Sequence, residues 1–158
     1  PAIEQIKQAV VQAGMDVVVG SGTLTINEAL DKFAVNKGVE IRAAINDGIL
    51  TGQTNQQIAA QIKDYGDNLH KGQINALVRT SINNASTQAR RIVTEENQNI
   101  LKGDEWVATL DKSTTLICGG RDGNIYPINS GPFPPAHWNC RSLRVPVVKD
   151  EFRIDDGL

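Results

Sequence analysis

The chain has 158 residues and 40% of them are apolar, which is enough for one domain of ordinary size or two small lobes with a core of their own. This length and the presence of only two cysteines exclude a disulfide-stabilised miniprotein. Charged residues make up 22% of the chain and the formal net charge is -2, which excludes both a disordered polyelectrolyte and a globally basic DNA-binding domain.

The apolar runs are short, and none approaches the roughly 18 to 20 residues that a membrane-spanning helix needs. We therefore expect a soluble chain that has no membrane partner. The sequence begins with Pro1 and Ala2, and it has neither an initiator methionine nor a basic segment followed by an apolar one. We interpret it as part of a longer polypeptide.

The composition changes near residue 104. Residues 1–103 are rich in alanine, glutamine and asparagine and contain no proline after Pro1, which is typical of packed helices. Residues 104–158 contain the other five prolines, and because proline fixes φ and removes an amide donor, this part must consist of short strands, turns and extended segments. The sequence predicts an α+β fold with a helical lobe over residues 1–103 and a small antiparallel β-rich lobe over residues 104–158.

Amphipathic patterns predict four helices in the first lobe. They cover residues 3–13, 25–48, 54–66 and 73–100. Gly38 marks a potential break in the second helix, and Thr54 followed by Gln57 has the spacing of a capping box that opens the third. The fourth helix, about 28 residues and about 42 Å long, is long enough to span a domain or to link two.

The second lobe is expected to hold a small meander of strands. Residues 105–110 and 114–118 have strand character, and residues 125–126 return as a third strand. Asp122 and Gly123 between them form a turn signal, because glycine adopts positive φ readily. Residues 130–135, called the proline arm below, are predicted to be extended because each residue before a proline is pushed to β or polyproline II geometry.

The proline arm leads to the candidate chemistry of the chain. His137 and Cys140 form an HxxC pair, and Cys118 precedes Cys140 by 22 residues with a turn between them. These three side chains are ligands that zinc accepts, with Asp111 or water as the fourth. Three alternatives remain open: a disulfide or contact between the cysteines, plain packing of buried side chains, and a nucleophilic thiol activated by His137.

A longer pattern includes these residues and resembles the head morphogenesis domain of tailed phages, typified by the F protein of phage Mu. The resemblance covers roughly residues 50–148. Its motif residues are Arg79, Thr80, Trp106, Asp111, Cys118, Gly123, Pro134, Pro135, His137, Asn139, Cys140 and Arg141. The sequence departs from the family pattern at Thr115 and Ser142, where many members carry two further cysteines.

The resemblance implies a minor head protein that binds portal and major capsid proteins while the phage head is assembled. It implies a place in the virion head, reached through the host cytoplasm, and no reaction, cofactor or small-molecule substrate. Some relatives contact DNA, and two arginine pairs offer phosphate contacts here, Arg90 with Arg91 and Arg141 with Arg144. The alternative for these pairs is solvent exposure or a carboxylate partner, such as Glu95 for Arg91.

A rival hypothesis is a metal-dependent or histidine-dependent nuclease of the toxin kind. Such an enzyme needs a base and groups that stabilise the phosphate. The residues that this lobe offers for those roles are His137, Arg141, Asp111 and Asp122.

Overall fold

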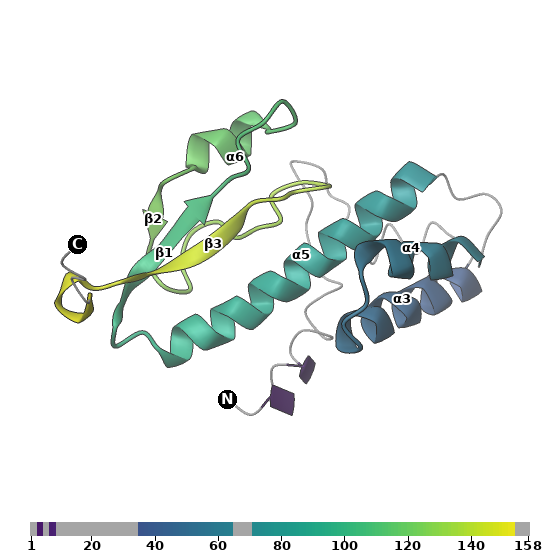
Figure 1. Cartoon of the computed structure of the whole chain (residues 1–158), viewed down its shortest axis with the longest axis horizontal. Helices are drawn as coiled ribbons and strands as arrows, with labels where there is room; N and C mark the ends of the chain where they lie inside the picture. The colour runs from purple at the N-terminus through teal and green to yellow at the C-terminus, as the bar shows by residue number, and fades with distance from the viewer. Residues whose placement is uncertain (1–2, 5–6, 9–34, 65–70, 154–158) are drawn as a thin grey trace, which may run out of the picture.

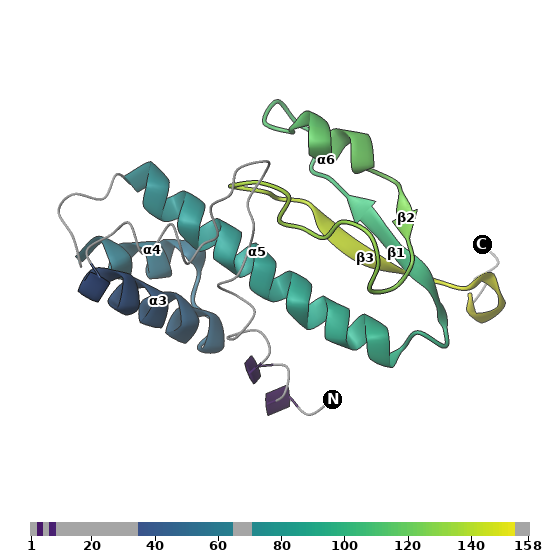
Figure 2. The same ribbon diagram turned by 180° about the vertical axis from the view of Figure 1, so that it is seen from behind.

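The computed structural model describes residues 3–4, 7–8, 35–64 and 71–153, and over these it confirms the α+β fold. Helices come first in the chain and include one long helix, and a three-stranded antiparallel sheet follows. In Figure 1 the long helix, α5, crosses the molecule, with two helices beside its N-terminal half and the sheet along its C-terminal half. The view from behind in Figure 2 shows the same order.

The two helices beside α5 are α3 (Val35–Leu50) and α4 (Asn55–Asp64). The break expected at Gly38 is wrong, because α3 runs through this position without interruption. Most of the helix expected over residues 3–13 and the start of the second helix lie outside the described residues. The two helices approach closely at Gly48, where an added Cβ would collide with the side chain of Ile58.

The predicted capping box at the start of α4 is confirmed. The Thr54 amide donates to Gln57 Oε1 at 2.8 Å, and the Gln57 amide donates to Thr54 Oγ1 at 3.3 Å. Both groups are thereby satisfied at the point where α4 begins, and the helix starts where the sequence pattern places it.

The long helix α5 spans Lys71–Glu96, which is 26 residues. It ends four residues earlier than predicted, because residues 97–100 form turns. Asn97 closes the helix: its side-chain amide donates to the carbonyl of Val93 at 2.7 Å. Ile100 continues the apolar pattern of α5 and so extended the predicted helix, although it belongs to the turn.

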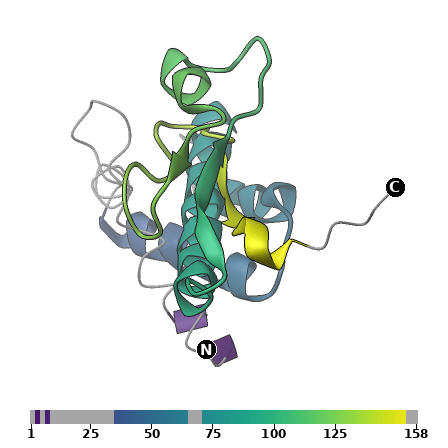
Figure 3. The same cartoon turned by 90° about the vertical axis from the view of Figure 1, so that its left-hand side faces the viewer.

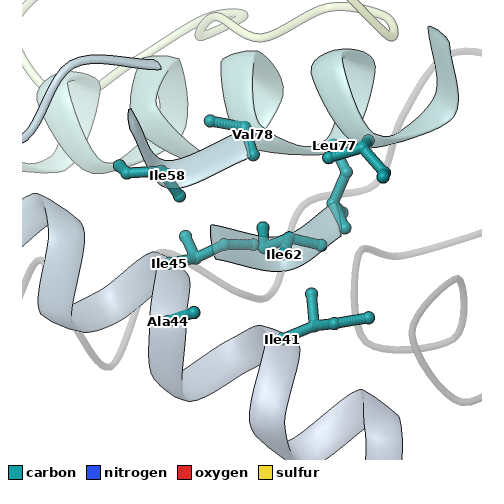
Figure 4. Packing of buried hydrophobic residues seen from close by; sticks show 8 residues of the cluster. Ile41, Ala44, Ile45, Ile58, Ile62, Leu77 and Val78 are labelled. Atoms are coloured by element: carbon teal, nitrogen blue, oxygen red, sulfur yellow. The ribbon is translucent and has the colours of Figure 1, made fainter. Parts of the chain in front are cut away.

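The helical core lies where α3, α4 and the first turns of α5 meet (Figure 4). Its members are apolar side chains that repeat at helical spacing and are at most 9% exposed. They are Ile41, Ala44, Ile45, Ile58, Ile62, Ile74, Leu77 and Val78.

The sheet consists of β1 (Leu101–Val107), β2 (Ile125–Tyr126) and β3 (Leu143–Val148), in the order β2-β1-β3. Both pairings are antiparallel, and the partners of Trp106 and Val107 in β3 are Arg144 and Leu143. The predicted meander is wrong, because its middle strand over residues 114–118 is not a strand. The sheet is completed instead by β3, which sequence analysis did not predict and which pairs with the edge of β1 opposite β2. Antiparallel pairing and the two-residue strand at 125–126 are confirmed.

Two predicted strands differ from the structure. The strand expected over residues 105–110 ends at Val107. The chain leaves the sheet there because the next amide, that of Ala108, donates to the Asp122 carboxylate at 2.7 Å instead of to a neighbouring strand. The strand expected over residues 114–118 is instead the short helix α6 (Leu116–Arg121). Thr115 caps this helix by accepting the Cys118 amide at 3.3 Å, and this capping bond favours helix over the β preference of the sequence.

The proline arm, residues 130–135, has no regular structure and packs into the fold rather than standing free. Pro134 and Pro135 are buried, and the carbonyls of Ser130 and Pro132 accept hydrogen bonds from Arg144.

Figure 3, which looks along α5, shows α6 on the side of the molecule away from α3 and α4.

Candidate functional site

The structure brings the three predicted cysteine and histidine side chains together. Cys118 Sγ lies 3.1 Å from His137 Nε2 and 3.8 Å from Cys140 Sγ. The three potential ligand atoms all lie within 4.8 Å of one another. Cys118 comes from α6, whereas the other two residues follow the proline arm, so the cluster joins two separate segments of the chain. We call these residues the CHC cluster.

The orientation of His137 is fixed by its backbone neighbour. Its Nδ1 lies 2.8 Å from the carbonyl oxygen of Trp138. A carbonyl can only accept a hydrogen bond, so Nδ1 carries the proton and the lone pair of Nε2 points at the Cys118 thiol. The side chain is therefore held in the tautomer in which Nε2 can act as a base or as a metal ligand.

Both thiols are buried: Cys118 is 3% exposed and Cys140 is fully buried. Burial raises the pKa of the Cys140 thiol, opposed in part by hydrogen bonds from the backbone at Ala136 and Ser142. The two sulfur atoms are not bonded to each other. A small cavity of about 10 Å³ lies against Cys118 and His137, and Thr115 and Ser142 line it as well.

Asp111, the expected fourth ligand, lies outside the CHC cluster. Its carboxylate forms a two-pronged ion pair with the Arg141 guanidinium, with N to O distances of 2.5 and 2.6 Å. The Arg141 guanidinium and the amide of Ser113 hold the pKa of the Asp111 carboxyl well below its usual range. The pair anchors the loop before α6 to the segment after Cys140.

Polar side chains of α5 hold the segment that carries the cluster. Asn83 donates to the carbonyl oxygens of Cys140 at 2.8 Å and of Ser142 at 3.1 Å. Thr80 Oγ1 accepts the amide of Asn139 at 3.1 Å. Asn139 has a φ of 60°, a left-handed conformation that asparagine tolerates better than most residues. These contacts give Thr80 and Asn139 their place in the motif, whereas sequence reasoning missed Asn83.

Trp106 and Gly123 form the support on the sheet side. Trp106 is fully buried against Cys118 and Cys140, and the Arg121 guanidinium lies 5.1 Å from the centre of its ring. The amide of Gly123, at a φ of 75°, donates to the Trp106 carbonyl at 2.9 Å. The expected turn at Asp122 and Gly123 is confirmed, and it explains why glycine stands there.

Arg144 is buried and does not reach solvent, so the phosphate contact suggested for it is wrong. It is 4% exposed, lies 3.5 Å from the Asp104 carboxylate, and stacks on the rings of Tyr126 and Phe133. Burial raises the pKa of Asp104 and lowers that of Arg144, and the attraction between the two opposes both shifts. Asp104 lies in β1 and Arg144 in β3, and the sequence contains no pattern that predicts this ion pair.

The other arginines differ in their surroundings. Arg91 lies over the Phe133 ring at 4.4 Å and donates to Asn129 Oδ1 at 3.3 Å and to Gln88 Oε1 at 3.3 Å, so its contacts differ from the Glu95 pairing considered from the sequence. Arg79 and Arg90 are exposed on the face of α5 that also carries Asn83. Together with Arg141 they line two adjoining open depressions of about 320 and 440 Å³ beside α5. We call this surface the arginine groove.

Within residues 3–4, 7–8, 35–64 and 71–153, no helix is both long and apolar enough to cross a membrane.

Comparisons with known proteins identify the family. The chain is 28% identical over 122 residues to a curated Haemophilus influenzae protein described as uncharacterized, and the match covers 73% of this chain and 26% of the relative. The chain thus spans about a quarter of the length of that relative. No solved structure matches this chain. The family model described as phage Mu protein F like protein matches residues 39–144, about two thirds of the chain. The chain therefore belongs to the phage Mu F-like family.

Proposed function

We propose that this chain is a minor head protein of a tailed phage and acts by binding portal and major capsid proteins while the head is assembled. The observation that carries the proposal is the family match over residues 39–144. Three of the motif residues support it, because they join α5 to the segment before β3: Asn139 donates to Thr80, and Cys140, like its neighbour Ser142, accepts from Asn83. A rigid junction of this kind suits a protein that holds binding surfaces in register.

The nuclease hypothesis has less support from the geometry. Nε2 of His137 contacts the Cys118 thiol at 3.1 Å, and the guanidinium of Arg141 is engaged by Asp111. The groups proposed as base and phosphate stabiliser therefore have partners within the fold, whereas a nuclease would direct them at the substrate.

Complementation tests the assembly role. A phage that lacks this gene is expected to form few infectious particles, and the gene supplied in trans is expected to restore them and to place the protein in purified heads or procapsids. To test for catalysis, wild-type and His137→Gln protein are each incubated with plasmid and RNA in the presence of divalent metal, and nucleic-acid cleavage by the two is compared. Absence of the protein from both heads and procapsids would refute the proposal, and so would nucleic-acid cleavage by the wild type that His137→Gln abolishes.

A contact with double-stranded DNA is a second candidate function, favoured by the arginine groove. Arg79 and Arg90 are 11 residues apart on α5, which places them about three turns apart on one face. Among the described residues that line the two depressions there is no carboxylate. Because the whole chain has a net charge of -2, any attraction for phosphate must come from such a local surface.

Charge removal in the groove is expected to weaken DNA binding. The double variant Arg79→Ala/Arg90→Ala should bind duplex DNA about 10-fold more weakly. The slope of log K against log salt concentration should become shallower by about 1.8, because each phosphate contact that forms releases about 0.9 of a counterion and two such contacts are removed. Fluorescence polarisation at several salt concentrations measures both quantities.

Lys102→Ala/Lys112→Ala is the matched control for this experiment, since it removes the same charge from exposed positions outside the residues that line the groove. It should leave the affinity and the slope close to those of the wild type. An equal loss in both double variants, or no binding by the wild type, would contradict a DNA contact at this surface.

A further inference from the structure

We propose that Cys118, His137 and Cys140 bind one Zn²⁺ ion, whose fourth coordination position faces the small cavity lined by Ser142 and is filled by water. The site would stand independently of the role in head assembly. Its ligand set of two thiolates and one imidazole matches the ligands that zinc takes in proteins. The first argument is the distance between the ligand atoms.

Two thiolates bound to a tetrahedral zinc ion at about 2.3 Å lie about 3.8 Å apart. Cys118 Sγ and Cys140 Sγ are 3.8 Å apart. An imidazole nitrogen and a thiolate on the same ion lie about 3.6 Å apart, so His137 Nε2, now 3.1 Å from Cys118 Sγ, would need to retract by about 0.5 Å. A change of this size is within the reach of side-chain rotation, and the backbone does not have to move.

The second argument is the way His137 is held. Its Nδ1–H donates to the Trp138 carbonyl at 2.8 Å, which leaves the Nε2 lone pair directed at the thiols. Histidine ligands of zinc are oriented in this manner, with the second ring nitrogen bound to a carbonyl or carboxylate. A disulfide between Cys118 and Cys140 would give this oriented lone pair no partner, and it would require the sulfurs to approach to about 2.05 Å.

The third argument concerns the fourth position. The cavity beside Cys118 and His137 has a volume of about 10 Å³, close to the space that one water molecule needs. Thr115 and Ser142, which also line it, bring hydroxyl groups to its wall. The Asp111 carboxylate is held away by Arg141 and is not required.

Binding would release both thiol protons to solvent, because zinc takes thiolates, so two negative sulfurs would offset the charge of the ion. The metal would tie α6, which carries Cys118, to the segment that Asn83 holds against α5. It would therefore brace α6 against the long helix. The expected role of the ion is structural.

The test uses the whole chain, purified under reducing conditions without chelators. We expect one zinc per chain by elemental analysis, an unfolding midpoint that rises with added Zn²⁺, and a thiolate-to-cobalt charge-transfer band after Co²⁺ is added to the metal-free protein. Cys118→Ser, Cys140→Ser and His137→Ala should each weaken zinc binding by more than about 100-fold, since even the loss of an outer-shell partner costs up to that much.

Two further variants keep the result interpretable if the ligand variants fail to fold. Asp111→Asn is the matched control and should retain one zinc per chain. Ser142→Cys adds a sulfur at the wall of the cavity and is expected to bind zinc at least about 10-fold more tightly than the wild type, because a fourth thiolate replaces water.

Three results would overturn the proposal. They are wild-type protein without zinc and without a cobalt charge-transfer band, both cysteines recovered as a disulfide from reducing buffer, and zinc binding lost in Asp111→Asn but kept in Cys140→Ser.

Discussion

Replacing Trp106 by alanine is expected to destabilise the protein by about 3 to 5 kcal/mol, the usual cost of removing a buried tryptophan. Trp106 is fully buried, and it packs on Cys118, Cys140 and the partly buried Tyr126. Apart from Tyr126, the described side chains of this hydrophobic cluster are small, so little can move in to fill the cavity. Urea unfolding followed by far-ultraviolet circular dichroism measures the effect.

Two comparison variants separate burial from other causes. Val107 follows Trp106 in β1 and is 37% exposed, so Val107→Ala should lower the free energy of unfolding by much less than Trp106→Ala does. Trp106→Phe keeps most of the apolar area and removes the indole N–H, which is buried with no partner in the described part of the chain. It should therefore cost less than Trp106→Ala. If Val107→Ala and Trp106→Ala cost the same, Trp106 does not anchor this core.

The helical part of the fold was the more predictable part, because its signals are local. The capping box at Thr54 and Gln57 needs only residues that are three positions apart, and the stripe of α5 repeats along one helix. The prediction failed where local preference and local capping disagree. Residues 114–118 have strand propensity, yet the Thr115 hydroxyl meets the Cys118 amide and a helix begins.

The sheet was less predictable because its pairing is not local. β3 pairs with β1 across about forty residues, and no pattern in the sequence of either strand indicates which strand it pairs with. The capture of Ala108 by Asp122, which ends β1, likewise joins residues 14 positions apart. Such contacts become visible only when the strands are in register.

The candidate site could be assembled from the sequence only in part. The HxxC spacing and the family pattern pointed to Cys118, His137 and Cys140, and the structure brings these side chains together. The pairing of Asp111 with Arg141 was missed. From the sequence alone, a carboxylate near three metal-ligating residues can be interpreted either as a further ligand or as the partner of an arginine. The arginine groove depends on which face of α5 meets residues 139–143, and sequence spacing does not determine that face.

Replacing Arg144 by leucine is expected to cost about 3 to 5 kcal/mol, because it leaves the Asp104 carboxylate buried without its counter-charge. The side chain also donates to backbone carbonyls across the segment between β2 and the proline arm, at Tyr126, Pro127, Ser130 and Pro132. The stacking on Tyr126 and Phe133 would be lost as well. The free energy of unfolding in urea at neutral pH measures the cost. Arg153→Leu, which removes an exposed arginine paired with Asp150, should change stability by less than about 1 kcal/mol.

The pH dependence of the Arg144→Leu variant identifies the buried charge as the cause. Burial already raises the pKa of Asp104, and Arg144 opposes this rise, so removing Arg144 should raise the pKa further. For a carboxyl whose pKa is higher in the folded than in the unfolded state, the penalty is present above the folded pKa and disappears as the pH falls through it. The stability gap between the variant and the wild type should therefore narrow as the pH is lowered from neutrality towards the ordinary pKa range of aspartate. Adding Asp104→Asn to Arg144→Leu removes the charge at every pH and should abolish this narrowing. If the double variant shows the same pH dependence as Arg144→Leu alone, the cost lies in the lost carbonyl contacts and not in the stranded carboxylate.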